Sequence, residues 1–177
     1  MNKLITGIAA TLLAVGVHAN DIELAISDEL IDLRLVTDYE KDFSGSFAYM
    51  HADQDRIESD QLSYTFATQG KLKRLNILLG ARAFFLDVEN VDGYGVALGG
   101  GGSLALIEKV SLSGELFYAP DIITGGDFDH TRDISLRLNY QLIDNGAVFI
   151  GYRDFEVDAG PDVDIYQDPY LGIRFSF

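Results

Sequence analysis

The fold of this chain is indicated by its last ten residues, 168–177, which read D-P-Y-L-G-I-R-F-S-F. Every second position is apolar: Pro169, Leu171, Ile173, Phe175 and Phe177. The positions between them carry Asp168, Tyr170, Gly172, Arg174 and Ser176. Such alternation predicts a strand with one apolar face and one polar face. A soluble sandwich rarely ends on an exposed aromatic strand, whereas in a closed barrel the last strand pairs with the first and no edge remains.

This terminal strand resembles the C-terminal signature of bacterial outer-membrane barrels, in which a final Phe follows apolar residues at alternate positions. The resemblance implies that the barrel-assembly machinery recognises the strand. The residues of that signal would be Tyr170, Ile173, Phe175 and Phe177. The alternative interpretation is an ordinary half-buried strand at the end of a soluble β-domain.

The composition fits one folded domain and excludes several kinds of site. The chain has 177 residues, of which 47% are hydrophobic, enough for one domain with a substantial core. It has no cysteine, which excludes disulfides, thiolate metal sites and a cysteine nucleophile. With 13 Lys and Arg against 28 Asp and Glu, the formal net charge is -15, so nucleic acid is not an expected partner.

The first 19 residues have the pattern of a cleaved secretory signal. Lys3 supplies the positive charge, residues 4–17 form the apolar segment, and Ala19 is the small residue that precedes cleavage. Cleavage is therefore expected before Asn20. The apolar segment is too short to span a bilayer, and a retained anchor helix is the alternative.

The remainder, residues 20–177, is expected to form a single domain of ten strands divided by polar turns. The expected strands are 22–27, 30–38, 43–52, 61–69, 75–87, 94–106, 110–118, 133–143, 147–156 and 166–177. The clearest pattern lies in 133–143, where Leu136, Leu138 and Tyr140 are separated by polar residues and are expected to face lipid. The first two segments have the weakest pattern, so eight strands is the alternative count. We predict an all-β fold: a closed antiparallel up-and-down transmembrane β-barrel.

The connections between the expected strands alternate in length from the C-terminus backwards. Long or medium connections are expected at 157–165, 119–132, 88–93 and 53–60, and short ones at 144–146, 108–109 and 70–74. Outer-membrane barrels have short periplasmic turns and longer extracellular loops. The longer connections are acidic, with the pairs Asp53/Asp55, Glu89/Asp92, Asp127/Asp129 and Asp162/Asp164. We therefore expect an acidic extracellular end. This end would bind divalent cations weakly and share them with lipopolysaccharide, or would be only a solvated rim.

Several short motifs resemble the YfaZ family of bacterial outer-membrane proteins. They are Gly80-Ala81-Arg82, Ala97-Leu98-Gly99-Gly100-Gly101-Gly102, Leu116-Phe117-Tyr118-Ala119-Pro120-Asp121, Gly126-Asp127, Gly151-Tyr152-Arg153 and Gly172-Ile173-Arg174-Phe175-Ser176-Phe177. The resemblance covers most of residues 20–177 and is weakest in the N-terminal third. It implies an outer-membrane β-barrel and brings no activity and no catalytic residues.

Five arginines fall on the polar faces of the expected strands: Arg34, Arg82, Arg137, Arg153 and Arg174. The acidic residues expected nearby are Asp32, Glu115, Asp133 and Asp154, although Asp154 is out of phase with Arg153 and is expected to face outward at the rim. The interior of an eight- to ten-stranded barrel is barely wider than its side chains, so charges there must pair. We predict a lumen filled by ion pairs. The alternative is a narrow pore with an arginine constriction.

Two histidines follow the signal, His51 and His130, each near Asp residues in the sequence. An Asp can orient an imidazole as a general base, so these residues define a possible rim-located membrane enzyme. The alternative is that each histidine belongs to a solvated polar loop without a catalytic role. No metal-ligand spacing and no cofactor motif is present, so no cofactor is expected.

The sequence therefore predicts a small, non-enzymatic and monomeric outer-membrane barrel with a plugged lumen. Its expected partners are outer-membrane lipid, lipopolysaccharide and the assembly machinery. A narrow porin-like channel and a rim-located hydrolase are the alternative functions. A soluble lipocalin-like barrel, with its apolar faces turned inward around a ligand, is the alternative architecture.

Overall fold

The computed structural model describes residues 19–40, 42–54, 56–89, 91–158, 160 and 162–177. The expected signal segment lies outside the described residues except for Ala19, and so does Asp55 of the acidic pairs. Among the described residues, no helix is both long and apolar enough to cross a membrane.

Eleven strands and one short 3-10 helix make up the described chain. The strands are β1 Asp21–Ile26, β2 Leu30–Glu40, β3 Phe43–Gln54, β4 Ile57–Leu72, β5 Leu75–Val88, β6 Val91–Ile107, β7 Val110–Ala119, β8 Thr124–Gly126, β9 His130–Ile143, β10 Gly146–Asp158 and β11 Asp162–Ser176. The helix, η1, is Asp121–Ile123. Ten of these strands correspond to the ten expected from the sequence, and β8 is an addition.

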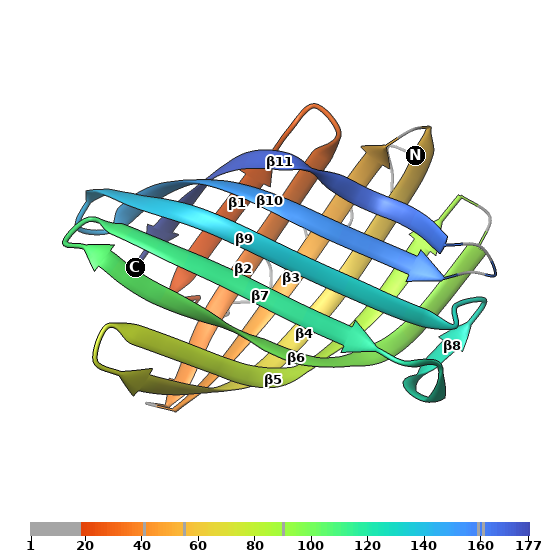
Figure 1. Ribbon diagram of the computed structural model, residues 1–177, viewed down its shortest axis with the longest axis horizontal. Helices are drawn as coiled ribbons and strands as arrows, with labels where there is room; N and C mark the ends of the chain where they lie inside the picture. The colour runs from red at the N-terminus through yellow and green to blue at the C-terminus, as the bar shows by residue number, and fades with distance from the viewer. Residues whose placement is uncertain (1–18, 41, 55, 90, 159, 161) are drawn as a thin grey trace.

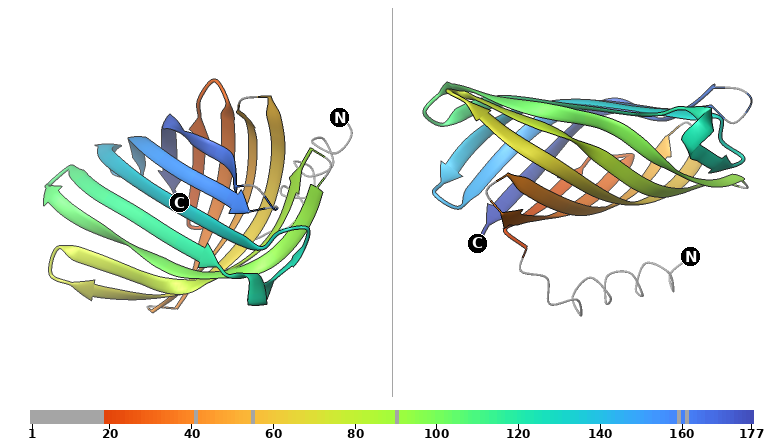
Figure 2. Two further views of the ribbon diagram at one scale, coloured as in Figure 1. Left: turned by 45° about the vertical axis from the view of Figure 1, so that its right-hand side comes forward. Right: turned by 90° about the horizontal axis from the view of Figure 1, so that it is seen from below.

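The ten long strands form one closed antiparallel barrel (Figures 1 and 2). Each strand pairs with its neighbour in the chain, β7 pairs with β9, and β11 returns to pair with β1. The closing register runs from Asp21 opposite Ser176 to Ile26 opposite Leu171. The predicted fold is confirmed, with ten strands and not eight in the barrel.

The two ends of the described chain meet at the closing seam. The backbone N–H of Phe177 donates to the carbonyl of Asn20 at 2.8 Å, and the N–H of Asn20 donates to the carbonyl of Val36 at 2.7 Å. Figure 1 shows the C-terminus at the end of the barrel opposite β8. This end is periplasmic in barrels of this kind, because it carries the short turns.

The predicted alternation of long and short connections is wrong in detail. Strand β3 continues to Gln54 and β4 begins at Ile57, and β10 continues to Asp158 before β11 begins at Asp162. Most residues expected in two long acidic loops therefore extend the hairpins. A backbone ladder forms equally well outside the membrane, where outward polar side chains meet water. The ten residues between β7 and β9 are the one long connection among the described segments, and they contain η1 and β8.

Strand β8 pairs only with the extracellular end of β6, through Gly93 opposite Gly126. It lies beside β6 beyond the point where β7 ends, so it extends the wall past the end of β7 (Figure 1). Gly93 has to be glycine, because a Cβ there would lie 2.1 Å from the ring of Phe128. Phe128 is buried, and it ties this connection to the end of the barrel.

The two faces of the wall are inverted relative to a soluble barrel. Outward residues of β9 such as Leu136 and Leu138 are 55% and 44% exposed, whereas inward Asp133 is 8% exposed. The outward side chains of β11, Leu171, Ile173 and Phe175, are exposed in the same way. Large apolar side chains facing out around a closed barrel require a hydrocarbon environment. A lipocalin-like barrel would show the reverse arrangement.

Candidate functional site: the barrel lumen

The extracellular end of the lumen is filled by apolar side chains. The buried ones include Leu30, Met50, Ala52, Leu86, Val88, Phe117, Phe128, Phe155, Val157, Ile165 and Tyr166. They come from strand ends that meet at this end of the barrel and from the connection before β9. This layer packs like the core of a water-soluble protein, and it closes the barrel toward the outside.

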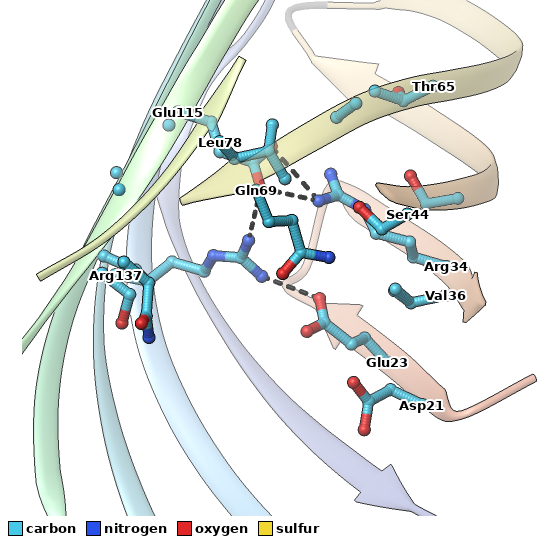
Figure 3. A pocket seen from close by; sticks show the side chains of 18 of the residues that line it. Asp21, Glu23, Arg34, Val36, Ser44, Thr65, Gln69, Leu78, Glu115 and Arg137 are labelled. Atoms are coloured by element: carbon cyan, nitrogen blue, oxygen red, sulfur yellow. Dashed lines mark hydrogen bonds and ion pairs between the residues drawn. The ribbon is translucent and has the colours of Figure 1, made fainter. Parts of the chain in front are cut away.

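A layer of ion pairs crosses the middle of the lumen, and Glu115 of β7 is at its centre. The Glu115 carboxylate accepts hydrogen bonds from Arg34 at 3.0 Å and from Arg82 and Arg137, each at 3.2 Å. These arginines come from β2, β5 and β9, so one carboxylate joins four strands across the barrel. Figure 3 shows Arg34 and Arg137 converging on Glu115.

Asp133 of β9 forms the second centre of this layer. Arg82 donates to it at 2.5 Å, and Arg153 donates to both of its oxygens at 2.8 Å. Arg153 also donates to Asp32 at 2.9 Å. The Arg153–Asp133 contact is bidentate and charge-assisted, the strong form of ion pair, and it offsets part of the cost of removing the charges from water.

Aromatic faces and glycines make room for the large arginines. The Arg82 guanidinium carbon lies 3.8 Å from the centre of the Phe117 ring, a cation–π contact. Gly99 and Gly101 of β6 have no side chain, so they leave space on the inner wall beside these groups. A Cβ at Gly99 would lie 2.1 Å from the carbonyl oxygen of Leu116, and one at Gly101 would lie 2.9 Å from Glu115 Cγ. Gly99 and Gly101 therefore relieve crowding in the lumen, as glycines within a strand often do.

The structure places all five predicted arginines in the lumen, but they are not equally engaged. Arg174 lies at the edge of the layer, 3.7 Å from Glu23, with a third of its side chain exposed. Asp154 does not join the layer, because it faces outward, as its phase indicates, and pairs with Arg132 at 3.3 Å. Arg132 also pairs with Glu156 on the outer face.

Sequence reasoning missed one lumen residue, Glu23 of β1. Its carboxylate accepts from Arg137 at 2.9 Å and lies close to Arg174, so it anchors the shortest barrel strand to the layer. The sequence does indicate an inward position for Glu23, because it lies between outward Ile22 and Leu24. The first strand is short, so this alternation covers too few residues to be recognised.

The periplasmic half of the lumen is open. A cavity of about 280 Å³ begins at the ion pairs and is lined mainly by hydroxyl, amide and charged side chains (Figure 3). A second cavity, of about 320 Å³, lies nearer the chain termini. The two share Asp21, Asn76, Ser103, Asn139 and Arg174, so they form one vestibule toward the periplasmic end.

The two histidines lie outside the lumen, and their carboxylate partners are not their neighbours in sequence. His51 Nδ1 lies 3.1 Å from Asp60, which also accepts from the Tyr49 hydroxyl at 2.5 Å. His130 Nδ1 lies 3.3 Å from Asp158. Cross-strand pairing brings these groups together, which sequence distance does not reveal. The two pairs come from different hairpins.

The acidic pairs expected at the extracellular end do lie at one end of the barrel, as far as they are described. Asp60 of β4 stands opposite Asp87 of β5, which stands opposite Asp92 of β6. Like charges directly opposite one another on adjacent strands repel. Within the described part of the chain, no three acidic or histidine groups are arranged to hold a metal ion.

A closed ten-stranded barrel with an apolar outer face and a polar lumen defines the class of this protein: it is an outer-membrane β-barrel. The family model described as YfaZ precursor matches residues 1–177. The chain belongs to the YfaZ family.

Individual relatives agree with this class. The outer membrane protein YfaZ of Escherichia coli strain K12 is 27% identical over 89 residues, which cover 49% of each chain. The match therefore spans about half of that relative. A bacterial polysaccharide outer membrane secretin gives a TM-score of 0.56 at 8% identity, with 84% of this chain and 56% of that chain covered. The KdgM porin, solved in complex with disordered oligogalacturonate, gives 0.50 at 12% identity, with 89% and 98% covered. At these identities the two structures show the fold alone.

Proposed function

We propose that this protein is a non-conducting outer-membrane barrel whose lumen is permanently blocked at the ion-pair layer. The observation that carries the proposal is the small space left around that layer. The cavity lined by Asp32, Arg34, Asp133 and Arg153 has a volume of about 20 Å³, room for roughly a single water. Above it the apolar layer continues to the extracellular end. A hydrated ion crossing the barrel would have to separate the ion pairs and enter an apolar core.

A non-enzymatic role accompanies this proposal. Each histidine has a single carboxylate neighbour and lies on the outer face, with no nucleophile aligned on the imidazole in the contacts of the described residues. Nucleophilic catalysis needs a nucleophile, a base and an orienting group in one hydrogen-bonded series. The contacts of His51 and His130 support a structural role at the rim.

Planar-bilayer recording tests the closed lumen. We expect the refolded barrel to insert without steady conductance, because the charged layer and the apolar layer both span the cross-section. The matched comparison is the double variant Leu86→Ala/Val157→Ala, which empties part of the apolar layer and leaves the ion pairs. This variant should also remain silent. A stable ohmic current through the unmodified barrel, with its selectivity altered by Arg137→Ala, would contradict the proposal.

A narrow porin-like channel is the second candidate. The observation that favours it is the fold similarity to the KdgM porin, 98% of which is covered by the match. A channel would require the Glu115 and Asp133 clusters to rearrange. In that case the current should appear in discrete steps with voltage or with low pH, since protonation of the carboxylates weakens the pairs.

We also propose that the assembly machinery recognises the C-terminal strand through its outward residues. Ile173 and Phe175 of β11 face outward and Phe177, directly after the strand, is exposed, whereas Tyr170 faces the lumen and packs on Phe149. Deleting Phe177 should therefore lower the amount of folded protein in the outer membrane of cells severalfold. Refolding of the same variant into detergent should be nearly unchanged, because Phe177 is 81% exposed. Tyr170→Phe is the matched control. Normal membrane levels of the truncated protein would count against recognition of this residue.

A further inference from the structure

We propose that the periplasmic vestibule is a binding site for a small hydroxylated anion, a molecule with one carboxylate or phosphate group and several hydroxyls. The site is the cavity of about 280 Å³ below the ion-pair layer. This volume corresponds to roughly nine liquid waters and lies just below the usual range for ligand pockets, about 300–1,000 Å³. The proposal goes beyond the closed lumen, because it assigns a ligand to the half of the barrel that the plug leaves open.

The closed end of the cavity presents guanidinium groups with unused donors. Arg34 bonds Glu115 through Nη1 alone, and Arg174 makes no hydrogen bond among the described residues. The Nε of Arg137 is buried and has no hydrogen-bond partner in the part of the chain that the structure describes. An arginine has five N–H donors in a planar fork that matches carboxylate and phosphate oxygens. Arg34 and Arg174 can therefore bind an anionic group without breaking their existing pairs.

The charge of the layer also favours an anion at this end. The whole lining of the cavity is neutral, with four arginines and four carboxylates (4 − 4 = 0), but Asp21 and Asp38 lie nearer the opening. Within the layer itself, five arginines face four carboxylates, Glu23, Asp32, Glu115 and Asp133, an excess of one positive charge (5 − 4 = 1). In a partly dehydrated cavity this excess is weakly screened. An anion bound at the closed end would neutralise it.

The side chains that line the cavity can form hydrogen bonds with the hydroxyl groups of a ligand. Ser44, Ser46, Asn76 and Ser103 line the cavity and can exchange hydrogen bonds with a ligand. Two carboxylates nearer the opening are engaged, among the described side chains, by neutral donors only: Asp21 accepts from the Ser176 hydroxyl and Asp38 from the Gln69 amide. Both carboxylates retain lone pairs for ligand hydroxyls. A simple anion without hydroxyls would meet these acceptors unfavourably, so the geometry selects a molecule that is both anionic and hydroxylated.

Access is from one side. The cavity continues into the second cavity near the termini, whereas its other end is closed by ion pairs and by the apolar layer. The ligand would therefore come from the periplasm.

A cysteine-protection experiment tests this site, because the natural chain has no cysteine. Ser46→Cys places a single thiol in the cavity, and Asp53→Cys places one on the exposed extracellular end of the same strand. The purified barrels in detergent are treated with a small charged thiol reagent in the presence of gluconate, glucose 6-phosphate or glucose. We expect gluconate or glucose 6-phosphate to slow modification at position 46 at least fivefold and saturably. Glucose should give much weaker protection, and position 53 should not respond.

Charge variants on the Ser46→Cys background identify the group responsible. Arg174→Gln should raise the ligand concentration that gives half-maximal protection at least tenfold, since Arg174 has the most unused donors. Arg132→Gln is the matched control, because Arg132 lies on the outer face of β9. Ser103→Phe, which fills the cavity, should abolish protection by any ligand. A heat-modifiability gel confirms that each variant is folded.

Three results would overturn the proposal: no protection by either anion, equal protection by glucose, or an equal effect of Arg132→Gln. Protection by only one of the two anions decides between carboxylate and phosphate. Conductance of the barrel is a separate measurement, so a conducting barrel that still shows protection would overturn the closed lumen and leave the site intact.

Discussion

Replacing Glu115 by alanine should lower the free energy of unfolding by about 3–5 kcal/mol, the effect expected when one partner of a buried ion pair is removed. Glu115 pairs with Arg34, Arg82 and Arg137. Arg82 and Arg137 keep Asp133 and Glu23 as partners, whereas Arg34 has no other ion pair in the described chain. The loss therefore falls mainly on Arg34. The measurement is equilibrium unfolding by urea in lipid vesicles or detergent.

Two further variants separate this effect from general disruption. Arg34→Met in the Glu115→Ala background should recover part of the lost stability, because it removes the charge left unpaired. Glu156→Ala breaks a pair with Arg132 at the outer rim, where the Arg132 side chain is 41% exposed, and should cost about 0–1 kcal/mol. An equal loss for Glu115→Ala and Glu156→Ala would mean that the lumen layer contributes no more than a surface pair.

Leu138→Arg should lower the stability of the folded barrel in lipid by about 2–4 kcal/mol, as for a charge at the bilayer midplane. Outward apolar residues of β9 run from Ile134 to Leu142, and Leu138 lies at the centre of this stretch. Its neighbours Arg137 and Asn139 face the lumen. The substitution therefore places a charge in hydrocarbon with no partner nearby.

The matched control is Leu142→Arg, the same change on the same face of the same strand, beside the periplasmic turn. There the side chain reaches the interface, and we expect a loss of about 0–1 kcal/mol. Refolding into vesicles of defined thickness measures both variants. Equal losses at the two positions, or a water-accessible spin label at Leu138 in the folded barrel, would contradict the membrane orientation.

The strands of the barrel could be predicted from the sequence, because the alternation of apolar and polar residues is a local pattern. A strand with one face in lipid and one in the lumen alternates residue by residue, and β9 carries that pattern over most of its length. The same alternation placed the five arginines on the inner face. Strand β1 was the weakest expectation because it is only six residues long, and Glu23 was missed for this reason.

The tight turns at the extracellular end could not be predicted, because their residues do not carry the usual signals. Arg56 and Glu89 have φ angles of 73° and 54°, the left-handed conformation that tight hairpins require. Glycine or asparagine is the usual residue there, so the sequence indicated longer loops. Local patterns also could not show which charged residues pair across the lumen. Glu115 and Arg34 are 81 residues apart, and only closure of the barrel brings them within 3.0 Å.

Phe177 and Asn20 are in contact, so they could be joined without moving any strand. The order of the strands along the chain could then be changed while their order around the barrel stays the same. A circular permutant that joins these residues and opens the chain at Asp144-Asn145 would keep every strand pairing, because that turn lies at the same periplasmic end. In such a chain β9 would become the terminal strand, and Phe177 would lie in the interior of the sequence. Folding of the wall and recognition of its last strand by the cell would then depend on different residues, although in the natural chain β11 serves both.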